Sequence, residues 1–385
     1  MLAELRETPD APLAEVFTSA LMVALARSVY SGPETDSREL LDTVRFPDSG
    51  SVESHLLDGF AAAAYAMPRT GVPTPRTSLA AQDRDAAYRW LAFLARSGHQ
   101  FAWWQLYLSL SRWGFTTLAM LSCAALAGPV VGLLAGVVFG HRFFAISGLS
   151  VALGVGVGAA PVARSRQRLS PSRVQWRIRG RGTEIRQTVV TALGAGLVGG
   201  VLFGVVFWLV ARDLNALLLG LVAGLVAGVA SGLGVGLVTA LQVPIEQAQV
   251  VSPRALLRTD RAHAILQACL AGLTSATVSG LAAALLARPQ ARVGVTIVAG
   301  AGVGFATILV VMCNSAWGRW QLSRAWLAIT GKVPWLLIEF LEDSHSRGIL
   351  RQTGGFYEFR HLKLQERLAA YHEPASHADS ALSPQ

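Results

Sequence analysis

The chain has 385 residues, of which 52% are hydrophobic and only 15% are charged, and its mean hydropathy is positive. This balance is typical of a polytopic membrane protein with modest soluble flanks and argues against an ordinary soluble protein. The formal net charge of +9 is carried almost entirely by arginine. A positive charge of this size is compatible either with binding to nucleic acid or with a position at the cytoplasmic surface of a membrane. The distribution of the basic residues along the chain distinguishes the two.

The first 110 residues contain no long apolar segment and predict a cytoplasmic helical region. They begin without the basic residues and apolar core of a signal peptide. Helices are expected over residues 13–30, 51–65 and 79–95, with Ser51 as the N-cap of the second and a loop over 67–75. His55 and His99 have no ligand partners nearby in the sequence and are interpreted as ordinary surface or boundary histidines.

Six apolar spans follow, and the short connections within successive pairs predict three transmembrane hairpins. The spans cover residues 115–139, 143–163, 188–211, 214–241, 264–287 and 293–313, each close to or above the ~20 residues that cross a bilayer. Tryptophan and tyrosine side chains favour the headgroup level, which predicts interfacial positions for two aromatic sets. They are Trp103, Trp104, Tyr107 and Trp113 before the spans, and Trp317, Trp320 and Trp326 after them.

Glycine recurs at every fourth position within several spans, which places small residues on one helix face. Such faces let helix backbones approach closely in lipid, where packing rather than the hydrophobic effect drives association. The fourth span, 214–241, is the clearest case and has no ionisable side chain. The predicted packing glycines are Gly128, Gly132 and Gly136 in the first span and Gly220, Gly224, Gly228, Gly232 and Gly236 in the fourth. A similar small-residue ladder runs through Gly272, Ala276 and Gly280 in the fifth span and Gly300 and Gly304 in the sixth.

Arginine and lysine near the span ends predict that both termini are cytoplasmic. Sixteen of these side chains lie on the side of the termini and four on the other side. The densest basic loop, residues 164–186, contains eight arginines and Trp176. It is interpreted as lying against anionic headgroups, and nucleic acid is the less favoured reading. The predicted location is therefore the cell membrane.

The sequence after the sixth span predicts a small cytoplasmic unit. A helix is expected over 334–347 with Pro334 in its first turn, then a β-hairpin with a turn at Gly354 and Gly355, and a last helix from His361 to Tyr371. Helix, hairpin and helix in this order are typical of the end of a winged-helix unit. Residues 374–385 are small and polar and are expected to be a disordered tail.

No catalytic or metal-binding constellation is found in the sequence. A phosphate-binding loop, a Gly-x-Ser-x-Gly elbow and a His-Glu-x-x-His pair are all absent, so we expect neither an enzyme nor a cofactor bound by this chain alone. The three cysteines, Cys123, Cys269 and Cys313, have no metal-ligand spacing and indicate neither a zinc site nor a disulfide framework. The spans also lack the ionisable side chains that ion-coupled carriers place in the membrane.

The soluble ends resemble bacterial NACHT-type NTPases of the STAND class. At the N-terminal end the resemblance rests on residues 21–27 (Leu-Met-Val-Ala-Leu-Ala-Arg), 40–42, 45–47 (Arg-Phe-Pro), 52–58 (Val-Glu-Ser-His-Leu-Leu-Asp) and 102–104. At the C-terminal end it rests on residues 340–343, 348–351 and 357–370, which contain Phe-x-His-x-x-x-Gln-Glu-x-x-Ala-Ala. The family's P-loop core is missing from these residues.

The resemblance implies that His361 approaches a nucleotide phosphate, with ATP or ADP held by a separate P-loop NTPase chain. A purely structural histidine remains the alternative for His361. The sequence thus predicts an all-α polytopic membrane protein with a helical region over 1–110, a six-span domain over 111–315 and a winged-helix-like unit over 316–373.

The predicted function is the membrane-anchoring regulatory or effector portion of a NACHT-like signalling or defence NTPase. The expected partners are the lipid bilayer, a P-loop NTPase chain and further copies in a homo-oligomer. Nucleic acid is not among the expected partners. Two alternatives stay open: a channel or carrier for a small uncharged solute, and an inactive truncated membrane protein.

Overall fold

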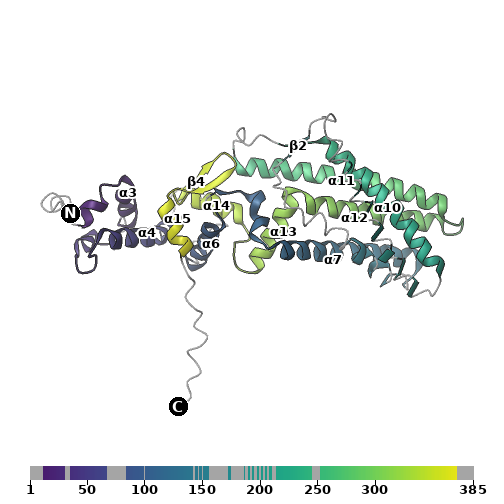
Figure 1. Ribbon diagram of the computed structural model, residues 1–385, viewed down its shortest axis with the longest axis horizontal. Helices are drawn as coiled ribbons and strands as arrows, with labels where there is room; N and C mark the ends of the chain where they lie inside the picture. Colours follow the sequence, from purple (N-terminus) through teal and green to yellow (C-terminus); the bar gives the residue numbers. More distant parts are fainter. Residues whose placement is uncertain are drawn as a thin grey trace, which may run out of the picture. The chain divides into compact units, whose positions relative to one another are not determined.

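The computed structural model divides the chain into two compact units (Figure 1). Unit 1 comprises residues 1–102 and 327–385, and unit 2 comprises residues 103–326. The structure describes residues 12–30, 35–66, 84–98, 100–141, 172–174, 214–244 and 252–370, together with short stretches within 144–155 and 186–209. The described residues are mostly helical with a few short strands.

Unit 1 begins with two helices where the sequence predicted one. Helix α2 covers Pro12–Val16 and helix α3 covers Ala20–Val29. The predicted continuous helix over 13–30 is wrong because the Thr18 hydroxyl donates to the Glu15 carbonyl at 2.6 Å and Ser19 takes an extended backbone conformation. The end of α3 at Val29, just before Tyr30, confirms the predicted C-terminal boundary.

Helices α4 (Ser49–Ala66) and α6 (Arg84–Ser97) build the first half of the core of unit 1, and the 3-10 helix η1 (Ser37–Leu41) precedes them. Asp48, rather than the predicted Ser51, caps α4, since its carboxylate accepts the Ser51 backbone N–H at 2.6 Å. The predicted apolar stripe of α4 is confirmed by buried Val52, Leu56, Leu57 and Phe60. The expected loop over 67–75 and His99 lie outside the described residues.

The C-terminal half of unit 1 contains helices α14 (Leu337–Ser346) and α15 (Leu362–Ala370) with strands β4 (Leu350–Thr353) and β5 (Phe356–Phe359) between them. The predicted hairpin is confirmed, and Gly354 in its turn has a φ of +58°. The expected start of α14 at Pro334 is wrong. Gly331, with a φ of +72°, ends the preceding helix, and the first i to i−4 bond of α14 joins the Phe340 N–H to the Leu336 carbonyl.

A strand from before the membrane block completes this sheet, which the sequence did not predict. Strand β1 (Gln100–Phe101) pairs antiparallel with β5, which gives the order β1-β5-β4. The two parts of the chain that flank the apolar spans therefore fold together in unit 1.

Unit 2 contains three described helices that are long and apolar enough to cross a membrane. They are α7 (Arg112–Phe139), α11 (Pro253–Leu286) and α12 (Arg292–Asn314). Helix α10 (Leu214–Leu241) matches the fourth predicted span in its bounds, and its described apolar stretch is Leu221–Leu233. The second and third predicted spans lie mostly outside the described residues.

Four described elements around the spans differ from the sequence predictions. Helix α11 begins eleven residues before the predicted fifth span, because Ser252 caps it by accepting the Ala255 N–H at 3.2 Å and Pro253 occupies its first turn. Helix α13 (Ala316–Ile329) follows α12 after a break at Ser315. Strands β2 (Ser172–Val174) and β3 (Gln242–Pro244) form a short antiparallel ladder.

Small residues mark the places where these helices approach most closely. A Cβ atom at Gly304 of α12 would lie 2.8 Å from the Gly272 carbonyl oxygen of α11, and one at Gly300 would lie 3.0 Å from the Ala276 carbonyl oxygen. In α7, a Cβ at Gly132 would lie 2.7 Å from the Phe144 carbonyl oxygen. Each site excludes a larger side chain unless the partner backbone moves. Figure 1 shows α11 and α12 running side by side.

The predicted interfacial aromatic sets divide into buried and exposed members. Trp113 (68%) and Trp326 (46%) are exposed and available to a membrane interface, whereas four other members are buried within the protein. The buried members are Trp103, Trp104, Tyr107 and Trp320. Trp103 and Trp104 lie on the 3-10 helix η2 (Trp103–Ser109) with their rings in edge-to-face contact, and Trp103 also contacts Trp320 edge-on.

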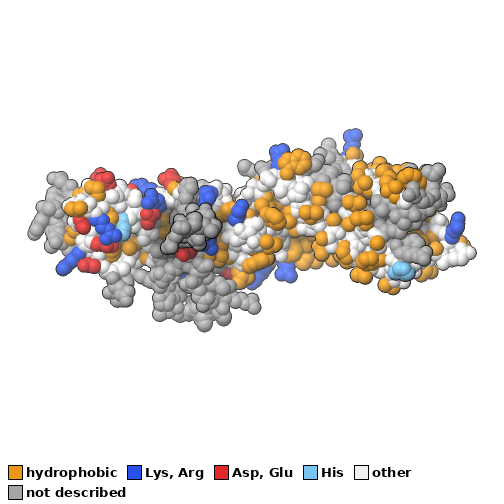
Figure 2. Space-filling model, turned by 90° about the horizontal axis from the view of Figure 1, so that it is seen from below, with side chains coloured by type: hydrophobic (Ala, Val, Ile, Leu, Met, Phe, Trp, Pro, Cys, Tyr) orange, Lys and Arg blue, Asp and Glu red, His pale blue; other side chains and the backbone are white. Residues whose placement is uncertain are grey.

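The surface of unit 2 is strongly apolar on the face seen in Figure 2, where hydrophobic side chains spread over the helices and the visible acidic side chains gather over unit 1. Exposed leucines such as Leu273 (64%) and Leu285 (76%) contribute to the apolar surface of α11. An apolar surface of this extent is expected of helices that face lipid and not water.

We expect Gly304→Leu to destabilise the contact between α11 and α12 by roughly 1–3 kcal/mol, because the new side chain enters the space of the Gly272 carbonyl and the Ala276 Cβ. The control is Gly194→Leu, since nothing lies within 4 Å of a Cβ at Gly194. Thermal unfolding in detergent should show a lower Tm for Gly304→Leu only. Equal Tm values for the two variants would contradict the close-packed contact.

Candidate functional site

His361 lies directly before α15, at the end of the β-hairpin. The Arg360 N–H donates to the Ile349 carbonyl at 3.0 Å, and the His361 carbonyl accepts the Gln365 N–H at 3.2 Å. Burial, followed by the positive charges of Arg360 and Arg351, lowers the pKa of His361. The imidazole is therefore neutral at physiological pH, and one ring nitrogen is free of a proton.

Arg351 and Glu358 form the polar part of this end of the sheet. The Glu358 side chain is buried, and its carboxylate accepts from Arg351 Nε at 2.9 Å and from Gln100 Nε2 at 2.8 Å. Gln100 belongs to β1, so this buried carboxylate ties all three strands together. Arg360, a neutral imidazole and the first turn of α15 thus lie together beside the ion pair of Arg351 with Glu358.

Helix α15 packs on α4 and α6. Gln365 is buried, and its side-chain Nε2 donates to the Ala95 and Gly98 carbonyls, both at 3.1 Å. Two ion pairs lie outside this contact: Lys363 with Glu53, and Arg367 with Asp58 in a two-bond arrangement at 2.7 and 2.8 Å. The glutamine of the Phe-x-His-x-x-x-Gln motif thus fixes α15 to the C-terminal end of α6.

A second set of contacts joins α14 to α4. Arg347 pairs with Asp343 at 2.8 Å, lies 4.7 Å above the Tyr65 ring and donates to the Ala64 carbonyl. The Tyr65 and Ser344 hydroxyl groups are 2.8 Å apart in a buried hydrogen bond. Burial is the main cause that raises the pKa of Tyr65, so the phenol stays protonated. Unit 1 is therefore closed by buried polar contacts as well as by apolar packing.

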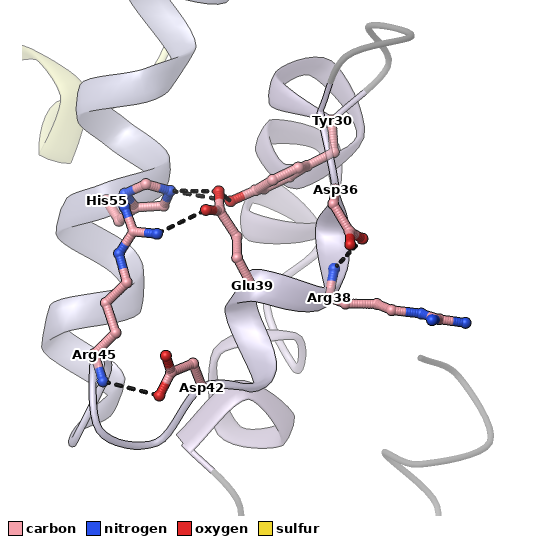
Figure 3. A network of polar contacts seen from close by, with 7 residues as sticks. All are labelled: Tyr30, Asp36, Arg38, Glu39, Asp42, Arg45 and His55. Atoms are coloured by element: carbon pink, nitrogen blue, oxygen red, sulfur yellow. Dashed lines mark hydrogen bonds and ion pairs between the residues drawn. The ribbon is translucent and has the colours of Figure 1, made fainter.

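A polar network at the N-terminal end of unit 1 surrounds Glu39 of η1 (Figure 3). The Tyr30 hydroxyl donates to Glu39 Oε1 at 2.5 Å and lies 3.0 Å from His55 Nε2, and Arg45 Nη1 donates to Glu39 Oε2 at 2.7 Å. His55 also packs against the Phe46 ring at 5.0 Å between centroids. Residues 45–47 and 52–58 of the family resemblance thus meet here, and His55 is a boundary histidine with polar partners.

The hydrogen bond between Tyr30 and Glu39 affects the pKa of both groups. It is the largest cause that lowers the pKa of Glu39, with the charge of Arg45 adding to it and desolvation opposing it. Burial, followed by this bond, raises the pKa of Tyr30. The network stabilises the ionised carboxylate and the protonated phenol.

The predicted packing glycines lie on helix contacts where the structure describes them. Gly128 faces Gly148 and Ala152, and Gly136 faces Phe144. Gly224, Gly228 and Gly232 are buried in α10. The surroundings of Gly220 and Gly236 lie outside the described residues. In the same part of the bundle, Ser275 donates to the Ala230 carbonyl at 3.2 Å and joins α11 to α10.

Two features of unit 2 were not foreseen from the sequence. Arg319, counted among the basic residues at the span ends, is 2% exposed and lies 5.1 Å above the Tyr107 ring; burial lowers its pKa. Cys123 of α7 and Cys313 of α12 bring their sulfur atoms to 3.4 Å. Only a prediction of which helices touch, and in which register, would have found this contact.

Searches with family models, against curated proteins and against solved structures found no match to this chain.

We expect Gln365→Ala to destabilise unit 1 by about 1–3 kcal/mol. The substitution removes the amide group that donates hydrogen bonds to two backbone carbonyls beside a buried helix contact. Arg367→Ala is the matched control on the same helix. Its ion pair with Asp58 is solvent-exposed and contributes less than about 1 kcal/mol. Chemical denaturation of the full chain in detergent, followed by the fluorescence of tryptophan, measures both. If Arg367→Ala lowers the free energy of unfolding more than Gln365→Ala does, the proposed contribution of Gln365 to the stability of unit 1 is wrong.

The network at Glu39 predicts a dependence of stability on acid pH. The folded-state pKa of Glu39 lies below the unfolded value of 4.5, so its contribution is complete above 4.5 and is lost as the pH falls below it. Tyr30→Phe should flatten this acid loss. Tyr88→Phe removes a bond to the Asp58 carbonyl, which does not titrate, and should lower Tm equally at all pH values. Melting curves at neutral and acid pH compare the two, and parallel pH profiles would contradict the prediction.

Proposed function

We propose that this chain is the membrane-anchoring regulatory or effector portion of a NACHT-like signalling or defence NTPase, whose P-loop core is supplied outside these 385 residues. The observation that carries the proposal is unit 1, in which segments from both sides of the membrane block fold together through β1 with β5 and α15 with α6. A regulatory unit built in this way couples any movement of its sheet to both ends of the membrane domain.

The arrangement around His361 supports a nucleotide phosphate as the signal. In the family that the soluble ends resemble, the corresponding histidine approaches the bound nucleotide. Here the pKa of His361 is lowered by burial and by the charges of Arg360 and Arg351. A phosphate at this position would balance the charge of Arg360, because Arg351 is already paired with Glu358, and it would accept hydrogen bonds from the first turn of α15. The role of the winged-helix-like end as a sensor follows from this proposal.

Six spans in three hairpins are part of the proposal. Both flanks of the membrane block join one unit with a charged surface, so the chain must return to the side from which it started. This requires an even number of crossings between residues 102 and 327. The described helices α7, α11 and α12 supply three, and α10 with the spans at 143–163 and 188–211 supplies the rest. The excess of arginine on the side of the flanks favours cytoplasmic termini in the cell membrane.

The proposal is tested by purifying the tagged full chain from native membranes in mild detergent and labelling the preparation with a photoreactive ATP analogue. We expect a labelled P-loop polypeptide, covalently continuous or separate, to accompany the wild-type chain. His361→Ala should reduce the retained label several-fold, because the imidazole no longer contacts the phosphate. His263→Ala, on the polar first turns of α11, is the matched control.

Absence of any labelled polypeptide, or equal labelling of the His361 and His263 variants, would overturn the nucleotide link. Swelling of proteoliposomes in an uncharged solute, at a rate that depends on the protein, would instead assign the bundle to a channel or carrier.

A further inference from the structure

The two sulfur atoms of Cys123 and Cys313 are in contact although the residues are 190 positions apart in the chain. Their separation is 3.4 Å, and Cys123 is 0% exposed while Cys313 is half-buried. Cys269, the third cysteine of the sequence, is exposed on α11. The chain therefore contains one thiol pair and one separate thiol.

The thiol pair lies at a defined level of the contact between α7 and α12. A Cβ at Gly294 would meet Val138, and one at Gly302 would meet Val131. Residues later in α12 therefore contact residues earlier in α7. The two helices are thus antiparallel, and the contact of Cys313 with Cys123 continues the same register. The pair stands at the end of this contact.

The joint between α12 and α13 follows the thiol pair immediately. Ser315, two residues after Cys313, has an extended backbone, and its side chain accepts the Gly318 N–H at 2.9 Å to cap α13. Beyond the joint, Leu322 of α13 packs on Tyr107 and Phe115, and Arg319 lies over the same two rings. The two cysteines therefore lie where the packing partner of α7 changes from α12 to α13.

We propose that Cys123 and Cys313 form a reversible disulfide that fixes α12 to α7 at this joint. The sulfur separation of 3.4 Å is about 1.4 Å longer than a disulfide bond of ~2.05 Å, a distance that rotation of two side chains can close. Disulfides outside oxidising compartments are usually transient and redox-sensing, and the disulfide proposed here is of that reversible kind.

Hydrogen peroxide is the oxidant in this proposal, because it is small and uncharged and enters apolar surroundings. The Cys313 thiolate, whose side chain is the more exposed, attacks one peroxide oxygen; the S–O bond forms, the O–O bond breaks, and hydroxide leaves as water with the thiol proton. The Cys123 sulfur then attacks the sulfenic sulfur of Cys313. The S–S bond forms, the S–O bond breaks, and a second water leaves with the proton of Cys123.

Two thiols are thus oxidised by two electrons, and one peroxide is reduced to two waters. A small-molecule thiol reverses the step by thiol–disulfide exchange and is itself oxidised to its disulfide. The disulfide would stop α12 from sliding along α7 and would fix the break at Ser315, on which the direction of α13 depends.

The test counts free thiols in the full chain reconstituted in proteoliposomes. After treatment with peroxide, the protein is denatured in detergent and tagged with a maleimide polymer, which adds one gel shift per free thiol. The untreated chain should take three tags, one for each cysteine. The treated chain should take one tag, on Cys269, and a reducing dithiol should restore three.

The variants separate the proposed disulfide from other oxidation products. Cys269→Ser should lose both of its tags on oxidation. Cys123→Ser should keep the tag on Cys269 and lose the tag on Cys313, because Cys313 then accumulates as a sulfenic acid that reacts with a dimedone probe. Cys313→Ser should show no such adduct. A membrane-permeant copper–phenanthroline oxidant repeats the count without requiring peroxide to reach the site.

Three tags after both oxidants would overturn the proposal and leave the pair as small buried hydrophobic residues. In the Cys269→Ser chain, a loss of tags that the dithiol does not reverse, or one accompanied by a covalent dimer on a non-reducing gel, would overturn it as well.

Discussion

The close approach of helix backbones is the constraint on which the membrane domain depends. In lipid there is no hydrophobic gain from bringing two apolar helices together, so contact has to come from packing of backbone on backbone. Gly272, Gly300 and Gly304 permit this between α11 and α12, where a Cβ would meet a carbonyl oxygen at about van der Waals distance or less. On the same helix α12, Gly294 and Gly302 face α7. Helix α12 thus contacts both α11 and α7 through glycine.

Unit 1 is built differently, because apolar side chains fill its core and charged side chains lie on its surface. Its core is closed by buried leucines from both flanks, such as Leu56, Leu91, Leu341 and Leu364. The polar groups that enter this core are satisfied in pairs: Gln365 by two carbonyls, Glu358 by Gln100 and Arg351, and Arg347 by Asp343. Buried polar groups with specific partners favour one arrangement of the flanks over others that would bury a similar apolar area.

The sequence was informative wherever the decisive interaction is local. Alternation and Gly354 predicted the β-hairpin, and glycine spacing identified the faces on which α11 and α12 meet. The predicted helix boundaries were wrong at Thr18 and at Asp48, because hydrogen bonds between these short polar side chains and the nearby backbone set the helix ends. The pairing of β1 with β5 and the contact of Cys123 with Cys313 join residues more than 180 positions apart, and no periodicity in one sequence encodes such a contact. In the candidate site, the sequence singled out His361. It did not predict the hydrogen-bond partners of Glu358 and Gln365.

The position of β5 at the centre of its sheet has a consequence for synthesis on the ribosome. Glu358 follows Gln100 by 258 residues, which takes roughly 13–50 s at about 5–20 residues per second. During that interval α4 and α6 have emerged, while the strand and the helix that cover them are still to be made. Until then, α4 and α6 lack the contacts with α15 that they have in the complete fold. Insertion of the membrane block and closure of unit 1 are thereby ordered in time, with closure last.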